Sequence, residues 1–356
     1  MARQERAPLL DRLGMALPII QAPMAGTSSP AMGAAVSDAG GLGSLGVGAV
    51  DAKGAAAMIA GVRERSPGPL NVNVFTHQPA KADTGLEQAW IERLRPEFQA
   101  LGAEPPEQLR EIYRSFVDDH DLLATLVAAR PQVVSFHFGL PPAGHIRALR
   151  EAGIVLFGSA TSLAEAQLLE AAGVDAIVAQ GFEAGGHRGV FDPDAPDDQL
   201  GTFALVRLLT RTLKTPVIAA GGIMDGAGIA AALELGAVAA QLGTAFVATD
   251  ESLADAGYRT ALLSDAAHHT RMTLAISGRP ARSLDNRFVR LGETVPQGAV
   301  PAYPIAYDLG KALHAAGKAR GEFGFGAQWA GQGAPLARAM PAAKLVATLA
   351  AELNQA

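Results

Sequence analysis

A glycine-rich loop around His187 contains the residues of this sequence that are best suited to chemistry. Gln180 begins it, and four glycines, Gly185 and Gly186 among them, lie within residues 180–189. Glycines let the backbone approach a ligand closely, and an imidazole titrates near neutrality and can act as a base or as an anion partner. A solvated loop histidine is the common alternative, but the position just after an apolar run favours a reacting group.

Two later segments resemble a phosphate cradle. Gly221 and Gly222 end one apolar run, and residues 241–244 end the next. Glycine N–H groups can point at an anion, and a helix that begins there adds a favourable dipole. Either segment alone could be a simple turn. Together, at consecutive late strands, they predict phosphate binding.

Four further residues are weaker candidates. Asn73 offers an amide that could serve a flavin ring edge or a phosphate, although it could be a plain turn residue. Met24, with Pro23 before it, could press on a planar cofactor or merely fill space. His137 could be a hydrogen-bonded interior side chain or could also touch substrate, and we leave both interpretations open.

The composition excludes several classes of protein. The chain has 356 residues, is 49% hydrophobic, and carries a net charge of −6 without a Lys/Arg cluster, so we expect no nucleic-acid partner. The absence of cysteine rules out disulfides, thiolate nucleophiles and iron–sulfur clusters. Eight scattered histidines give little support for a metal site. With no apolar N-terminal segment, we expect a soluble cytoplasmic protein that does not enter membranes.

Short apolar runs alternate with amphipathic stretches, a pattern typical of βα units around a parallel sheet. Eight runs are predicted as strands: 18–24, 41–47, 70–75, 133–139, 154–159, 175–181, 216–221 and 239–247. Predicted helix caps at Ser29, Ser162 and Asp225 begin three of the intervening helices. The fold class that follows is α/β, a (β/α)8 TIM barrel whose reacting groups lie at the carboxyl ends of the strands.

Two segments exceed a minimal barrel. Residues from about 76 to 130 form an expected insertion within a barrel of residues 1–248. Residues 249–328 are expected to be a mostly helical cap after the eighth strand, in which Arg279 and Arg282 supply positive charge. Residues 329–356 are expected to return to the barrel as helices, with Trp329 near the cofactor.

In six segments, the chain resembles the class I nitronate monooxygenases, formerly called 2-nitropropane dioxygenases. The matching segments are residues 21–26, 39–43, 71–75, 134–139, 179–189 and 220–226. The resemblance implies an FMN-dependent barrel that oxidises alkyl nitronates, such as propionate 3-nitronate, with O2 through a flavin semiquinone. The products would be a carbonyl compound and nitrite.

The resemblance also assigns roles. His187 matches the family's catalytic histidine, and Asn73 would bind the flavin. The other positions implied to line the flavin or to hold its ring and phosphate are Ala22, Pro23, Met24, Gln180, Gly185, Gly222, Gln241, Leu242, Gly243 and Thr244.

Two rival functions stay open. An FMN-dependent NAD(P)H reductase of quinones or enoyl thioesters could use the same barrel, and flavin reduction by NADH or NADPH without oxygen would identify it. A barrel that binds a phosphate ligand without redox chemistry would purify colourless. The chain could also form a homodimer.

Overall fold

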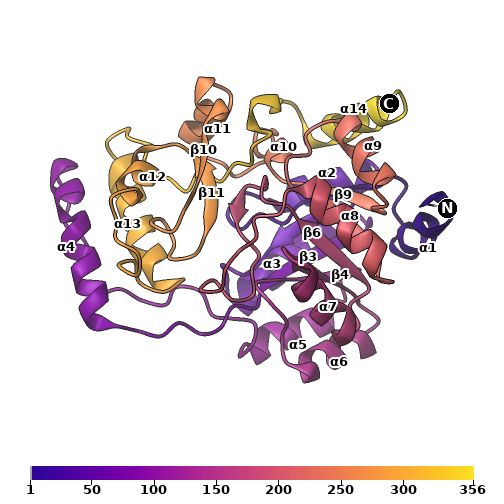
Figure 1. The fold of residues 1–356 in the computed structure, drawn as a ribbon, viewed down its shortest axis with the longest axis horizontal. Coiled ribbons are helices and arrows are strands. Elements are labelled where there is room, and N and C mark those ends of the chain that lie inside the picture. The colour runs from indigo at the N-terminus through magenta and orange to yellow at the C-terminus, as the bar shows by residue number, and fades with distance from the viewer. Residues whose placement is uncertain (1) are drawn as a thin grey trace.

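The computed structural model describes residues 2–356, and eight parallel strands form its centre (Figure 1). In chain order they are β1 (Ile19–Gln21), β2 (Gly43–Gly46), β3 (Leu70–Phe75), β4 (Val133–His137), β5 (Val155–Ala160), β6 (Ala176–Gln180), β8 (Val217–Ala220) and β9 (Ala239–Leu242). The order in the sheet is β1-β9-β8-β6-β5-β4-β3-β2, and a parallel bridge between Ile20 and Leu42 closes the ring. The predicted TIM barrel is therefore confirmed.

Helices cover the outside of this barrel. They are α2 (Pro30–Asp38), α3 (Ala52–Arg63), α5 (His120–Ala129), α6 (Ala143–Glu151), α7 (Leu163–Ala172), α8 (Thr202–Thr212), α9 (Gly226–Glu234) and α14 (Ala342–Leu353). The predicted caps are confirmed, since the side chains of Ser29, Ser162 and Asp225 accept hydrogen bonds from the first turns of α2, α7 and α9. None of the described helices is long and apolar enough to cross a membrane.

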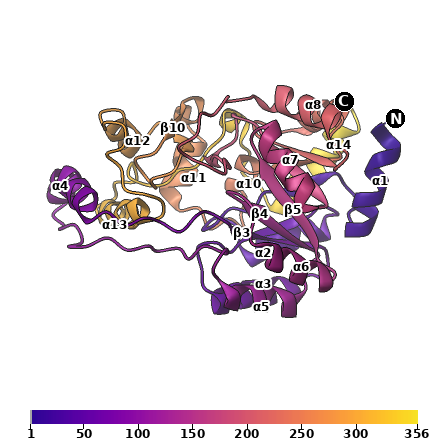
Figure 2. The same cartoon turned by 60° about the horizontal axis from the view of Figure 1, so that its bottom comes forward.

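One end of the barrel is closed by apolar packing. The helix α1 (Ala2–Leu13) places Leu9 and Leu13 against Ile20 and Leu42 at the amino ends of the strands. Figures 1 and 2 show α1 on the side of the barrel away from α4 and α13. The opposite end, where the strands finish, is left for a site.

A second body lies beside the carboxyl ends of the strands. It contains α4 (Thr84–Ala100), α11 (Ala256–Leu262), η1 (Asp265–His268), β10 (Thr270–Thr273), β11 (Ala281–Leu284), α12 (Arg287–Gly292) and α13 (Ile305–Lys318). Trp90 and Phe98 of α4 share a core with Phe288, Leu309 and Phe325. The segment between β3 and β4 therefore contributes α4 to this body, where it lies beside α13 (Figure 2), and α5 to the barrel.

Two local predictions need correction. The eighth strand stops at Leu242, and α10 (Thr244–Val247) follows, so the predicted strand 239–247 was too long because its apolar second half is helical. The loop after β6 also contains a short strand, β7 (Gly186–His187), which was not predicted. It pairs antiparallel with β11, so His187 lies opposite Ala281.

Candidate active site

A pocket opens at the carboxyl ends of the strands, between the barrel and the second body. It encloses about 1330 Å³ of empty space, counting its open mouth. The predicted site residues that line it are Ala22, Pro23, Met24, Asn73, His137, Gln180, Gly185, Gly186, His187, Gly221, Gly222, Gln241, Gly243 and Thr244. Leu242 is absent from its walls because alternation along β9 turns that side chain into the hydrophobic core outside the barrel.

His187 lies in an aromatic part of this pocket. Its ring centroid is 5.1 Å from that of Trp329 and 5.3 Å from that of Tyr303, and Phe138 lies edge-on at 5.7 Å. These rings remove water from the imidazole. Desolvation, together with repulsion from Arg279 and from the protonated forms of His137 and His77, lowers the pKa of His187 to about 3. The side chain is therefore neutral near pH 7, so it can accept a proton but does not attract an anion by its own charge.

The orientation of the Ser277 hydroxyl sets which nitrogen of His187 can accept a proton. The Ser277 hydroxyl donates to the carbonyl of Arg279 at 3.2 Å and lies 2.9 Å from His187 Nε2. With its proton on that carbonyl, the hydroxyl accepts from Nε2–H. This tautomer leaves the Nδ1 lone pair available.

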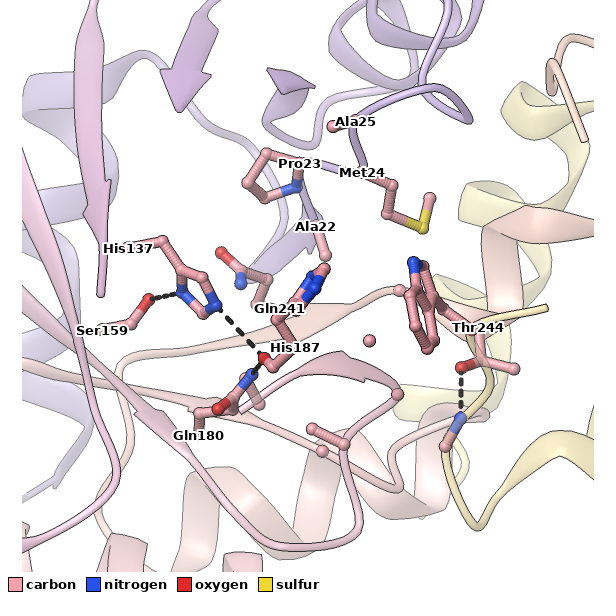
Figure 3. Close-up of a pocket in the computed structure, with 18 of the residues that line it drawn as sticks. Ala22, Pro23, Met24, Ala25, His137, Ser159, Gln180, His187, Gln241 and Thr244 are labelled. Carbon is pink, nitrogen blue, oxygen red and sulfur yellow. Dashed lines mark hydrogen bonds between the residues drawn. The ribbon is translucent and has the colours of Figure 1, made fainter. Parts of the chain in front are cut away.

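Two predicted site residues hold the backbone of His187. His137 Nε2 lies 3.2 Å from the carbonyl oxygen of His187, and Gln180 donates its side-chain amide to the same oxygen at 3.0 Å (Figure 3). The other ends are also engaged, since His137 Nδ1 meets Ser159 at 3.1 Å and Gln180 Oε1 accepts from Gly189 N–H. Both side chains line the pocket, but these bonds give them a positioning role. Substrate contact by His137 stays a prediction.

Three buried arginines fasten the same loop from behind. Arg282 donates through Nε and Nη2 to the carbonyl of Phe182, and Arg279 donates to the carbonyl of Val190. Arg188 forms a 2.8 Å ion pair with Asp197. The positive charge that the sequence suggested in the cap is therefore directed at loop carbonyls, and neither Arg279 nor Arg282 lines the pocket.

All four tyrosines of the chain line this one pocket, which the sequence analysis missed. Tyr113 precedes α5, and Tyr258 lies in α11. Tyr303 lies just before α13, and Tyr307 lies in its first turn. The hydroxyl of Tyr303 is buried without a hydrogen-bond partner in the described structure. A cluster of rare tyrosines in the cap segment was the available signal, but residues so far apart in sequence reveal their proximity only after folding.

The part of the pocket beneath the His187 loop is built from backbone in close contact. A Cβ on Gly185 would lie 2.5 Å from the amide nitrogen of Gly331, and Gly222 has a φ of +72° with Glu183 directly beside it. Side chains at either position would strain the backbone or fill the cradle. Larger residues would therefore remove the space that the sequence analysis assigned to a phosphate.

The electrostatics of this cradle differ in part from expectation. Carboxylates already occupy the N-terminus of α9, since Asp225 caps it and Glu352 accepts from Gly226 N–H. Its dipole is therefore not available to a phosphate. The start of α10 at Thr244 remains, and the Thr244 hydroxyl accepts from Gly331 N–H at 3.0 Å (Figure 3). Within the described chain, the pocket walls contain no Lys, Arg, Asp or Glu.

These observations are compatible with a bound flavin mononucleotide, which needs a glycine-lined space for its phosphate and amides for its ring. Among the described residues, none hydrogen-bonds the Gln241 side chain, which leaves its amide free for a ring edge, while Asn73 is held by Ser135 at 3.0 Å. Residues 2–356 contain no group of three metal-ligating side chains placed to hold a metal ion.

Comparisons with known proteins agree with this geometry. The model of the family described as nitronate monooxygenase matches residues 6–352. A nitronate monooxygenase of Paraburkholderia phytofirmans is 62% identical, covering 98% of this chain and 95% of the relative. The solved structure of a nitroalkane oxidase from Streptomyces ansochromogenes is 43% identical with a TM-score of 0.90, covering 98% of each chain. The structure of FabK from Thermotoga maritima is 30% identical with a TM-score of 0.75, covering 98% of this chain and 96% of its own.

Proposed function

The chain belongs to the nitronate monooxygenase family of oxidoreductases, and from this premise we propose that it oxidises alkyl nitronates with O2 at the pocket around His187. The products are a carbonyl compound and nitrite, and the cofactor is FMN. The observation that carries the proposal is a neutral histidine in the wall of an uncharged, glycine-lined pocket at the strand ends.

The residues that would hold FMN divide into two groups. Gly222, Gly243 and Thr244 would receive the phosphate through backbone N–H groups and a hydroxyl. Asn73 and Gln241 would meet the ring with their amides, together with the remaining predicted lining residues Ala22, Pro23, Met24, Gln180, Gly185, Gly186 and Gly221. When bound, FMN would supply the electron transfer between the nitronate and O2.

His187 would move the proton when the substrate is a neutral nitroalkane. Its Nδ1 lone pair takes the proton from the carbon next to the nitro group, and the C–H electron pair becomes the C=N bond of the nitronate. The new imidazolium is held by Ser277, which accepts from Nε2–H. A preformed nitronate needs no such step.

Tyr303 would bind the nitro group. Burial raises the pKa of Tyr303 well above its usual value, so the phenol keeps its proton across the working pH range. An unpartnered phenol O–H in a pocket wall is suited to donate to a nitro or nitronate oxygen. Residues 249–328, with α4, would form the cap that excludes water above the reacting atoms.

Purification and one pair of variants test the cofactor site. The protein should purify yellow with FMN bound without a covalent link, and Gly222→Asp should lose the flavin because a carboxylate would face the phosphate. Gly153→Asp is the matched control, since Gly153 also has a positive φ but open space around it. Full FMN occupancy in Gly222→Asp would contradict the assignment.

Activity assays test the reaction. An alkyl nitronate supplied with O2 should yield nitrite in proportion to the oxygen consumed. Rapid bleaching of the flavin by NADH or NADPH without oxygen, with no nitrite from nitronates, would instead favour the reductase.

A further inference from the structure

Arg279 is a buried cation whose charge the reaction described above does not use. Its side chain is only 4% exposed and makes no ion pair with any described carboxylate. One Nη group donates to the carbonyl of Val190, and Nε has no hydrogen-bond partner in the described structure. Burial lowers the pKa of Arg279 to about 10, which still leaves it charged at neutral pH. An unpaired buried charge is costly and is rarely kept without a function.

The guanidinium and His187 lie against the same aromatic ring. The central carbon of Arg279 is 4.2 Å from the ring centroid of Phe138, and the neighbours of that ring include His187, edge-on at 5.7 Å, and His137 at 4.4 Å. The Arg279 backbone is also involved, since its carbonyl accepts from the Ser277 hydroxyl, which lies 2.9 Å from His187 Nε2. Arg279 is therefore connected to His187 both through Ser277 and through the ring of Phe138.

No described carboxylate is close enough to Arg279 to neutralise its positive charge in an ion pair. Tyr303, Glu165, Asp192 and Asp194 raise the pKa of Arg279, but none of the three carboxylates forms an ion pair with it. The titratable groups packed around His187 are His77, His137, Tyr303 and Tyr307. The histidines have pKa values lowered to about 4 and the phenols raised values, so all four are neutral near pH 7.

We propose that Arg279 is a positioning residue whose charge acts across Phe138 as the counter-charge for an anion bound beside His187. This inference rests on the proposed function, because the anion it names is the nitronate. The same positive potential opposes protonation of His187 and favours a planar oxyanion in a pocket whose own walls carry no charged side chain.

Anion binding gives the first test. Arg279→Met should weaken binding of nitronates, and inhibition by nitrate as a planar oxyanion probe, by about tenfold. KM for the neutral nitroalkane should stay within about twofold. Arg279→Lys keeps the charge and should restore most of the affinity. Equal effects on charged and neutral substrates would overturn the proposal.

The titration of His187 gives a second test that needs no catalysis. In Arg279→Met holoenzyme, the NMR-detected pKa of His187 should rise by at least one unit, whereas Arg279→Lys should leave it low. Arg287→Met is the control, because the Arg287 guanidinium also lies over a phenylalanine ring, 4.8 Å from the centroid of Phe325, and does not touch the His187 loop. It should leave the His187 titration unchanged. An unchanged titration in folded Arg279→Met, or an equal rise in Arg287→Met, would refute the electrostatic role even if the protein oxidised no nitronate at all.

Discussion

The hydroxyl of Ser277 is the smallest feature that matters for function. When it donates to the carbonyl of Arg279, it accepts from His187 Nε2–H, and Nδ1 keeps its lone pair. The low pKa of His187 then means that this nitrogen is unprotonated over the whole physiological range. A single hydroxyl orientation thus converts a loop histidine into a base of defined direction.

Replacing His187 with Asn should separate the two substrate types. Asn keeps some hydrogen bonding but cannot accept a proton, so activity on neutral nitroalkanes should fall by roughly 10² or more. Activity on preformed nitronates should fall less, and FMN content should be unchanged. Steady-state nitrite release with both substrates measures this. Equal losses on both would make His187 a binding group, and no loss on either would direct attention to His137.

Tyr303→Phe should have opposite effects on activity and stability. Removing a buried hydroxyl that has no partner should leave the free energy of unfolding unchanged or raise it by about 1 kcal/mol. If that hydroxyl meets the nitro group, kcat/KM should fall about tenfold on both substrates. Denaturant unfolding of the apoprotein measures the free energy of unfolding, and nitrite assays measure kcat/KM. Unaltered kcat/KM would remove Tyr303 from the substrate contacts.

At the scale of elements, β7 and β11 connect the barrel loop to the second body. Their pairing sets His187 opposite Ala281 and Gly186 opposite Arg282. The guanidinium of Arg282 adds two hydrogen bonds to the carbonyl of Phe182 and packs over that residue's ring at 4.7 Å. The loop is therefore held both by the pairing of β7 with β11 and by the Arg282 side chain.

Arg282→Met should loosen this connection. Leaving a buried carbonyl without its donor should cost about 1–3 kcal/mol in the free energy of unfolding. Amide hydrogen exchange of residues 182–191 should speed up more than that of the barrel strands. Exchange that rises equally everywhere would show that Arg282 stabilises the whole fold and not this loop in particular.

The sequence predicted elements with strong local patterns and missed those that depend on distant partners. Eight strands could be found because each is a short, doubly buried apolar run. The strand at Gly186–His187 could not, since two residues form a strand only where β11 offers an edge. Gly221 and Gly222 could be identified from type and spacing. Tyr303 could not, because nothing near it in sequence shows that its ring lies 5.3 Å from His187.

At the scale of the whole molecule, the site also affects stability toward acid. His77, His137 and His187 have pKa values lowered to about 4, 4 and 3, with burial as the main cause in each. In the unfolded chain all three regain the ordinary value of about 6.5. The unfolded chain therefore binds more protons than the folded protein between about pH 6.5 and 4.

The free energy of unfolding should consequently fall as the pH drops from about 6.5 to 4. Each histidine contributes up to roughly 1.4 kcal/mol per pH unit in that window and nothing above it. Denaturant titrations at pH 7, 6 and 5 would measure how the free energy of unfolding changes with pH. The variant His77→Asn should reduce this slope by the contribution of about one bound proton. Equal stability at pH 5 and pH 7 would contradict the burial of these groups.

The antiparallel pairing of β7 with β11 has a consequence for when the site can form during synthesis of the chain. His187 emerges from the ribosome 90 residues before Ser277 and earlier still than the strand that pairs with it. Because domains begin to fold as they are synthesised, the barrel strands can assemble while the catalytic loop still lacks its partners. A nascent chain released at the end of β9 would hold most of the glycine cradle but no oriented base. The enzyme thus becomes competent only near the completion of its own translation.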